Sequence, residues 1–150
     1  MELLAIELNS KTHQSVLPSN TIGSVRTLVE FCESPLAAAQ HADALTVHLA
    51  LTDATKHIVN DDILNAVNPG AYIINASRGE MVDEDALIRA MNERGLRAGL
   101  DVFDNEPTPS IHICMHNAIS LTPHIGAATL EAQSRIGTEL AEQISKIYNK

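Results

Sequence analysis

Three residues whose side chains suit acid–base and carboxylate chemistry, Arg78, Glu106 and His124, each follow a different apolar segment of the chain. A guanidinium can hold a carboxylate through two parallel hydrogen bonds. An imidazole exchanges a proton near neutral pH, and a neighbouring carboxylate stabilises its charged form. If the fold brings these side chains together, they form a site that binds an acid and moves a proton on it.

Each of these residues also has an ordinary structural explanation when it is taken alone. Arg78 can be a solvated turn residue, and Glu106 in the stretch FDNEP can belong to an Asn/Asp/Pro turn. His124 in the stretch LTPHIGAAT can be a loop histidine that faces water. The elements that carry the residues decide between these explanations.

The apolar segments before these residues have the composition of strands in a parallel sheet. They show little alternation of apolar and polar residues, which is expected for strands buried on both faces. Their ranges are 44–49, 71–75, 97–102 and 118–122. Helical segments between them predict β–α–β units and a doubly wound parallel sheet of the α/β class. Because ligands bind at the carboxyl ends of such strands, the three chemical side chains are expected at one edge of the sheet.

Helices are predicted over residues 33–42, 60–67 and 83–95. Their expected N-caps are Ser34, Asn60 and Asp83, residue types whose side chains accept hydrogen bonds from the first turn. Gly95 is expected to end the third helix in a left-handed conformation.

A last helix is predicted from residue 129 to about residue 148. It has an apolar stripe opposite a charged one, so we expect it to pack against another surface. The stripe consists of Ala132, Ile136, Leu140, Ile144 and Ile147.

Composition limits the function further. The chain has 150 residues, the size of one domain, and its net charge of −9 comes with no cluster of Lys or Arg, so we expect neither nucleic acid nor an anionic membrane as partner. No segment reaches the roughly 20 apolar residues of a membrane span, and a cytoplasmic location is expected. Cys32 and Cys114 are interpreted as buried thiols without a disulfide, and no metal site is expected.

Four motifs together resemble the nucleotide-binding half of the D-isomer-specific 2-hydroxyacid dehydrogenases, and among these most the D-3-phosphoglycerate dehydrogenases. They are ADALTVHLALTDAT, NPGAYIINASRGEMVDEDALIRA, AGLDVFDNEP and SLTPHIGAATLEAQ. The resemblance implies a Rossmann-like fold and an enzyme that uses NAD to oxidise a small D-2-hydroxy acid to the 2-oxo acid. Its first candidate substrate is 3-phosphoglycerate, which is oxidised to 3-phosphohydroxypyruvate in serine biosynthesis.

The resemblance also implies roles for individual residues. His124 is the acid–base group, Glu106 is its partner, and Arg78 grips the substrate carboxylate. Asp101 is implied to contact the nicotinamide carboxamide. The residues implied to line the cofactor are Thr52, Ala76, Ser77, Arg78, Asp101, His124 and Gly126.

The sequence departs from the family pattern at several places. Ala50 stands where the family has a proline after the histidine at the end of a strand, and no G-x-G-x-x-G is present, since Gly23 stands alone. The first βαβ unit with its Gly-rich loop is therefore expected to be absent, as is the substrate domain. Residues 1–150 are interpreted as a single truncated NAD-binding domain, in which 1–28 match the family weakly and 29–150 are family-like.

Three hypotheses remain open from the sequence. The chain is part of an NAD-dependent dehydrogenase, a non-catalytic module of the same fold that binds dinucleotide or dimerises, or an inert remnant. A partial sheet exposes an edge strand and apolar helix surface, so a homo-oligomer is expected.

Overall fold

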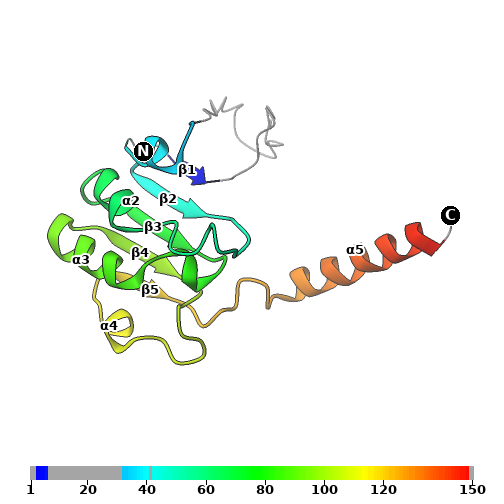
Figure 1. The fold of residues 1–150 in the computed structure, drawn as a ribbon. Coiled ribbons are helices and arrows are strands. Elements are labelled where there is room, and N and C mark those ends of the chain that lie inside the picture. Colours follow the sequence, from blue (N-terminus) through cyan, green and yellow to red (C-terminus); the bar gives the residue numbers. More distant parts are fainter. Residues whose placement is uncertain (1–2, 7–31, 41, 149–150) are drawn as a thin grey trace, which may run out of the picture.

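The computed structural model contains a parallel sheet, helices packed on the sheet, and a long C-terminal helix that projects away from it (Figure 1). It describes residues 3–6, 32–40 and 42–148. The strands are β1 (Leu3–Ile6), β2 (Ala44–Val47), β3 (Tyr72–Asn75), β4 (Arg97–Leu100) and β5 (Ile119–Leu121). The helices are α1 (Pro35–Ala39), α2 (Asp61–Ala66), the 3₁₀ helix η1 (Gly79–Met81), α3 (Glu84–Arg94), α4 (Ile111–Cys114) and α5 (Leu130–Tyr148).

All strands pair in parallel, in the order β1-β2-β3-β4-β5. Each of the four predicted strand segments contains one of β2 to β5, so the prediction of a Rossmann-like parallel α/β sheet is confirmed. The sequence pattern does not predict β1, because a short apolar segment is not distinctive enough to identify a strand. The stretch NSKTHQSVLPSNT and Gly23 lie outside the described residues.

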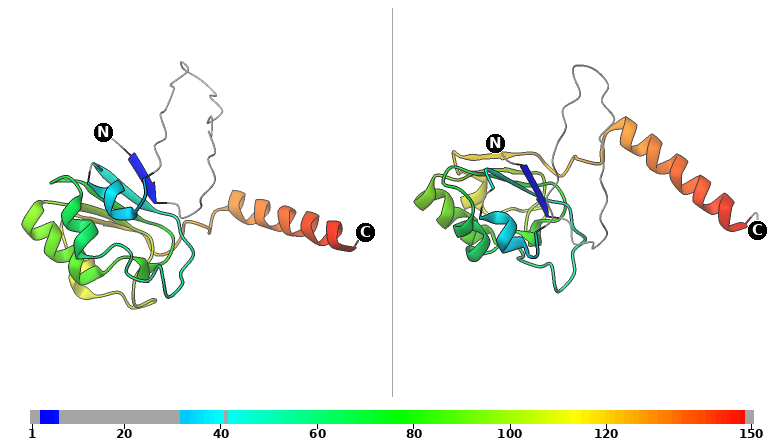
Figure 2. Two further views of the ribbon diagram at one scale, coloured as in Figure 1. Left: turned by 45° about the horizontal axis from the view of Figure 1, so that its top comes forward. Right: turned by 90° about the horizontal axis from the view of Figure 1, so that it is seen from above.

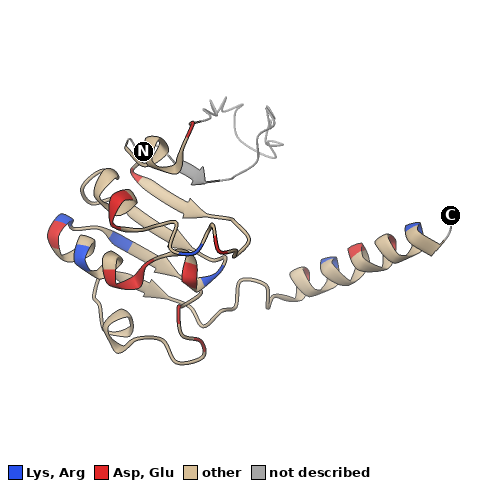
Figure 3. Cartoon of the chain, in the orientation of Figure 1, with Lys and Arg blue, Asp and Glu red and all other residues tan. Residues whose placement is uncertain are grey.

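Side-chain caps begin the helices where the sequence predicts them. Ser34, Asn60 and Asp83 each accept a hydrogen bond from the backbone N–H three residues later, at 3.1, 3.2 and 2.9 Å. Gly95 ends α3 with a φ of 69°, in the left-handed region that favours glycine. Acidic residues gather at the starts of α2 and α3, where they complement the helix dipoles (Figure 3).

Helices α1 to α4 lie on one face of the sheet (Figure 2). The strand order explains this, because successive right-handed crossovers that advance in one direction place every helix on the same side. A doubly wound sheet has a helix layer on each face, and the described residues contain one of these two layers. The expected burial of the strands on both faces is therefore wrong here: on β3, Ile73 is fully buried, whereas Tyr72 and Ile74 are 44% and 39% exposed on the open face.

The hydrophobic core fills the space between the sheet and this helix layer. It joins inward side chains of the strands to those of α2 and α3, among them Leu45, Val47, Ile73, Leu100, Leu64, Leu87 and Met91. These packed side chains hold the strands in register and so fix where each strand ends.

The C-terminal helix α5 forms where predicted, but it does not pack as expected. Thr129 caps it by accepting a hydrogen bond from the N–H of Ala132 at 3.1 Å. None of its side chains is buried, and Ile136 is 54% exposed. The stripe shows that the helix has an apolar face, but such a pattern cannot identify the surface that covers it. No helix in the described ranges is long and apolar enough to cross a membrane.

Both cysteines are free and exposed, so their interpretation as buried thiols is wrong. Cys114 is the last residue of the one-turn helix α4, which leaves it at the protein surface. A single cysteine carries no signal in the sequence that shows whether its side chain is buried or exposed.

We expect Leu87→Ala to lower the free energy of unfolding by about 2–5 kcal/mol, because it leaves a cavity beneath fully buried neighbours. Ile136→Ala on α5 should change that free energy by no more than about 0.5 kcal/mol, as exposed substitutions do. Urea unfolding followed by circular dichroism measures both. Equal losses in the two variants would contradict the exposed position of α5.

Candidate active site

The loops that follow β3, β4 and β5 leave the sheet at one edge, because the strands are parallel (Figure 1). These loops carry Arg78, Glu106 and His124, respectively, as the sequence predicts. The contacts of each side chain show which of them the fold brings together.

His124 and Glu106 form a direct pair. The distance between His124 Nδ1 and Glu106 Oε2 is 2.7 Å, and the two side chains are 47% and 36% exposed. This hydrogen bond holds the pKa of the Glu106 carboxyl below its usual range. With the carboxylate charged, Nδ1 is the donor, which leaves Nε2 of His124 to face a ligand.

Asp101, which directly follows β4, fastens the loop that carries His124. Its carboxylate accepts hydrogen bonds from Thr122 Oγ1 at 2.6 Å, from the N–H of Ile125 at 2.9 Å and from the N–H of Gly126 at 2.7 Å. Burial by itself would raise the pKa of Asp101, but the three hydrogen bonds outweigh it and hold the pKa below its ordinary value. His124 lies within this fastened loop, with a φ of 53° that is uncommon outside glycine.

Gly126 allows this close approach, since a Cβ there would lie 2.9 Å from Asp101 Oδ2. Gly79 plays the same part for the loop that carries Glu106. A Cβ on Gly79 would collide with the carbonyl group of Phe103, so η1 and this loop touch through their backbones. The glycine of the NASRG motif is a sequence signal from which this contact could have been predicted.

Arg78 lies at the same edge, but no hydrogen bond or ion pair among the described residues joins it to Glu106 or His124. Its guanidinium donates to the carbonyl of Ser77 at 2.6 Å, and its side chain is exposed. Of the three residues expected to converge, His124 and Glu106 are thus in direct contact, whereas Arg78 makes no hydrogen bond or ion pair to either in the described part of the chain. Arg78 keeps donors available for a carboxylate ligand.

Two buried polar residues that the sequence analysis did not single out hold the remaining loops. Asn75, 1% exposed at the end of β3, donates from Nδ2 to the carbonyl of Arg78 at 2.8 Å and accepts from Ser77 Oγ at 2.9 Å. Thr55, 7% exposed, donates to the carbonyl of Ala50 at 2.8 Å. A polar residue that ends an apolar run, as in AYIIN, is the signal that could have identified Asn75.

This edge is where the sequence leads us to expect the nicotinamide end of a dinucleotide. Ala76, with only a methyl group, and Gly126, which has no side chain, are both exposed at this edge. Thr52 lies in the loop after β2, where its backbone N–H donates to Thr55 Oγ1 at 2.8 Å. The contact of Asp101 with the carboxamide stays a prediction, since its oxygens already accept from the loop after β5.

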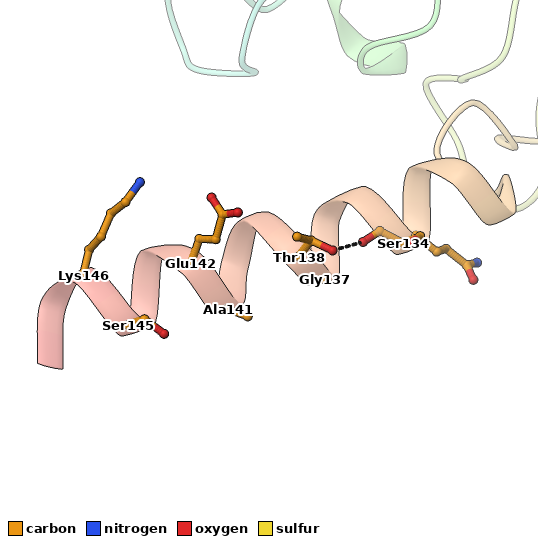
Figure 4. Close-up of a pocket in the computed structure, with 8 residues that line it drawn as sticks. Ser134, Gly137, Thr138, Ala141, Glu142, Ser145 and Lys146 are labelled. Atoms are coloured by element: carbon orange, nitrogen blue, oxygen red, sulfur yellow. Dashed lines mark hydrogen bonds between the residues drawn. The ribbon is translucent and has the colours of Figure 1, made fainter. Parts of the chain in front are cut away.

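Two shallow hollows lie away from this edge. Figure 4 shows a furrow of about 730 Å³ along α5, where Gly137 and Ala141 leave space and the hydroxyl of Thr138 donates to the carbonyl of Ser134 at 3.0 Å. The other, of about 570 Å³, lies on the open face of the sheet beside Arg97. Neither contains a predicted site residue, and no group of three metal-ligand side chains occurs in the described part of the chain.

The sequence of this chain is similar to those of known proteins. Residues 15–126 match the family described as D-isomer specific 2-hydroxyacid dehydrogenase, NAD binding domain. D-3-phosphoglycerate dehydrogenase 2, chloroplastic, of Arabidopsis thaliana is 40% identical over 107 residues, which cover 69% of this chain and 17% of the relative. Hydroxypyruvate reductase of Thermotoga maritima is 40% identical over 112 residues, covering 71% of this chain and 36% of the relative. The chain thus spans well under half the length of these relatives.

Solved structures of related proteins share the fold. A D-isomer specific 2-hydroxyacid dehydrogenase from Polaromonas is 32% identical with a TM-score of 0.70, over 79% of this chain and 37% of that chain. D-lactate dehydrogenase from Aquifex aeolicus, solved with NAD and lactic acid, is 26% identical with a TM-score of 0.63, over 77% of this chain and 40% of that one.

We expect Asp101→Asn to lower the free energy of unfolding by about 1–3 kcal/mol at pH 7, because the amide turns a donor toward a backbone N–H. The folded-state pKa of Asp101 lies below its unfolded value of about 3.9. The difference between the two proteins is therefore complete above about pH 4 and shrinks as the pH falls through the folded-state pKa. Urea unfolding between pH 7 and pH 2.5 measures it, and a difference that grows toward low pH would contradict this assignment.

Gly79→Ala should lower the free energy of unfolding by about 1–3 kcal/mol, because the added methyl group displaces the backbone of the neighbouring loop. Gly99 in β4 is the matched control, since a Cβ there meets nothing within 4 Å. Thermal unfolding of the two variants tests the contact. A Gly79→Ala protein as stable as Gly99→Ala would show that η1 and the loop do not touch as described.

Proposed function

The chain belongs to the D-isomer specific 2-hydroxyacid dehydrogenase family, within its NAD-binding domain, and on this premise we propose that it carries the acid–base part of the active site of an NAD-dependent dehydrogenase of D-2-hydroxy acids. The observation that supports this most directly is the contact of 2.7 Å between His124 Nδ1 and Glu106 Oε2. It gives an imidazole with one nitrogen held by a carboxylate and the other free for a substrate.

The proton transfer follows from this geometry. During oxidation, Nε2 of neutral His124 takes the proton of the substrate hydroxyl as the C2 hydrogen departs as hydride. Glu106 stabilises the imidazolium that results, because its carboxylate is charged and hydrogen-bonded to Nδ1. During reduction of the 2-oxo acid, the same nitrogen returns the proton to the new hydroxyl. NAD, when bound, accepts the hydride.

Arg78 is proposed to bind the substrate carboxylate. Its exposed guanidinium lies in the loop after β3, at the edge that also carries His124, and no acidic side chain in the described ranges is paired with it. A bidentate contact to the carboxylate would orient the substrate carbon next to the imidazole. Removal of Arg78 should therefore affect substrate binding more than proton transfer.

The residues proposed to hold the nicotinamide end of NAD are those that line this edge. They are Thr52, Ala76, Ser77, Arg78, Asp101, His124 and Gly126. Their loops are held by buried side chains, so the edge is formed before a ligand binds.

For the substrate, we propose 3-phosphoglycerate, oxidised to 3-phosphohydroxypyruvate, which would place the protein in serine biosynthesis in the cytoplasm. The support is sequence similarity: relatives named D-3-phosphoglycerate dehydrogenase reach 42% identity over 104 residues, for example in Mycobacterium leprae. The hydroxypyruvate reductase of Thermotoga maritima is 40% identical to this chain. Hydroxypyruvate is therefore the second substrate that should be tested beside 3-phosphohydroxypyruvate.

The alternative function is a non-catalytic dinucleotide-binding or dimerisation module. The observation in its favour is apolar surface without cover, since Tyr72 and Ile74 on the open sheet face and the stripe of α5 are exposed. Such surface also supports a homo-oligomer for the dehydrogenase itself.

We expect the chain to bind NADH and to oxidise it with 3-phosphohydroxypyruvate. His124→Gln should lower kcat by about 10²–10⁴-fold and leave NADH binding intact, because the variant lacks only the group that transfers the proton. Arg78→Gln should mainly raise KM for the 2-oxo acid. NADH absorbance measures turnover, and NADH fluorescence measures binding.

His112 on α4, an exposed histidine outside the site, provides the matched control, and His112→Gln should keep full activity. Unchanged turnover in His124→Gln would refute the acid–base assignment. NADH binding and concentration-dependent assembly without turnover would favour the module.

A further inference from the structure

A second histidine–carboxylate pair lies next to the first. His57, in the loop after β2, and Asp104, two residues before Glu106, are joined by a distance of 3.6 Å between His57 Nε2 and Asp104 Oδ2. This separation suits an ion pair but is too long for a hydrogen bond. His57 Nε2 and Asp104 Oδ1 are shielded from solvent and have no hydrogen-bond partner among the described residues. Two shielded polar atoms without partners are costly, which points to a role for the pair beyond surface charge.

His57 is held in place by its backbone. Its φ of 50° lies in the left-handed region, where only a few per cent of residues other than glycine are found. Its N–H donates to the carbonyl of Glu80 at 2.7 Å, which fastens this loop to η1. The imidazole therefore approaches Asp104 from an anchored position.

The opposite side of the contact is also anchored. The N–H of Asp104 donates to Glu84 Oε1, in the first turn of α3, at 3.0 Å. The carbonyl of the preceding residue, Phe103, touches the backbone of Gly79. Three elements thus meet at residues 103 and 104: the loop after β2, η1 and the start of α3.

Several carboxylates gather around this contact. Burial raises the pKa of Asp104, the nearby His57 lowers it, and Glu80 raises it again. Burial also raises the pKa of Glu84, as does the charge of Asp104. Lys56 lies 3.9 Å from Glu80, so that carboxylate has a cation beside it.

This anchored segment leads directly to the proposed catalytic pair. The N–H of Phe103 donates to Glu106 Oε1 at 3.1 Å, and the other oxygen of that carboxylate meets His124. A hydrogen bond therefore closes residues 103–106 into one turn, and the anchored Asp104 lies between its two ends.

We propose that the ion pair between His57 and Asp104 is a positioning contact for the carboxylate of Glu106. This inference rests on the proposed function in one respect, that the pair of Glu106 and His124 is catalytic. The contacts of His57 and Asp104 are present without any ligand. No hydrogen bond or ion pair among the described residues joins His57 to His124 or Glu106, so it acts through the loop.

The test uses the 150-residue chain with ¹³C-labelled Asp and Glu carboxyls and ¹⁵N-labelled histidine. His57→Asn removes the imidazole but tolerates the left-handed backbone. We expect the pKa of Asp104 to rise further, because its cation is lost. We also expect the pKa of Glu106 to rise toward its ordinary value and the low-field Nδ1 proton signal of His124 to weaken, because the carboxylate moves away.

Asp104→Asn should give the same two changes at Glu106 and His124 while leaving the backbone of residue 57 untouched. Glu106→Gln identifies the Nδ1 proton signal. Arg89→Gln is the matched control, because it breaks another ion pair, to Asp61 at 2.7 Å, on the surface of α2 and α3, and should leave both signals unchanged.

Unchanged Glu106 titration and His124 signal in His57→Asn and Asp104→Asn, with cooperative unfolding retained, would overturn the inference. A change in only one of the two variants would overturn it as well, since the proposed positioning needs both members of the pair. The readouts require neither NADH nor turnover. The two variants could show the expected changes at Glu106 and His124 while the wild-type chain shows no dehydrogenase activity. That result would count against the proposed function and leave the positioning contact standing.

Discussion

The carboxylate of Asp101 makes the contact on which the proposed site depends. It accepts hydrogen bonds from Thr122, Ile125 and Gly126 and so joins the loop after β5 to the end of β4. Without this contact, the loop that carries His124 would be held to the rest of the fold by β5 before it and by the side-chain contact of His124 with Glu106. A charged group with three donors is held more firmly than a neutral one, which keeps the imidazole beside its partner.

The other loops at this edge are held in the same way. Asn75 fastens the loop after β3, and Thr55 fastens the loop after β2, each through a buried polar side chain. Glycine at positions 79 and 126 lets backbones and side chains approach where a Cβ would collide. The edge is therefore organised by the fold itself, and a ligand would meet side chains already in position.

Two apolar surfaces of the described residues, the open face of the sheet and the stripe of α5, are not covered by other elements. The sheet carries helices on one face, and the stripe of α5 has no cover within the described residues. The match covers 17% of the Arabidopsis relative and 36% of the Thermotoga one, so most of their length has no counterpart here. Exposed apolar surface of this kind marks a site for contact with another surface, which is compatible with the oligomer proposed above.

The sequence by itself determined strands β2 to β5, helices α1, α2, α3 and α5, and the loops that carry Arg78, Glu106 and His124. Helix caps, terminal glycines and apolar runs act over a few residues, and the carboxyl ends of parallel strands must share an edge. Only the tertiary structure decided that His124 meets Glu106 directly, that α5 stands exposed, and that Asp101 and His57 anchor the loops. These contacts join residues far apart in the chain, such as Asp101 and Thr122, which are separated by 21 positions, and no local pattern records which distant groups will meet.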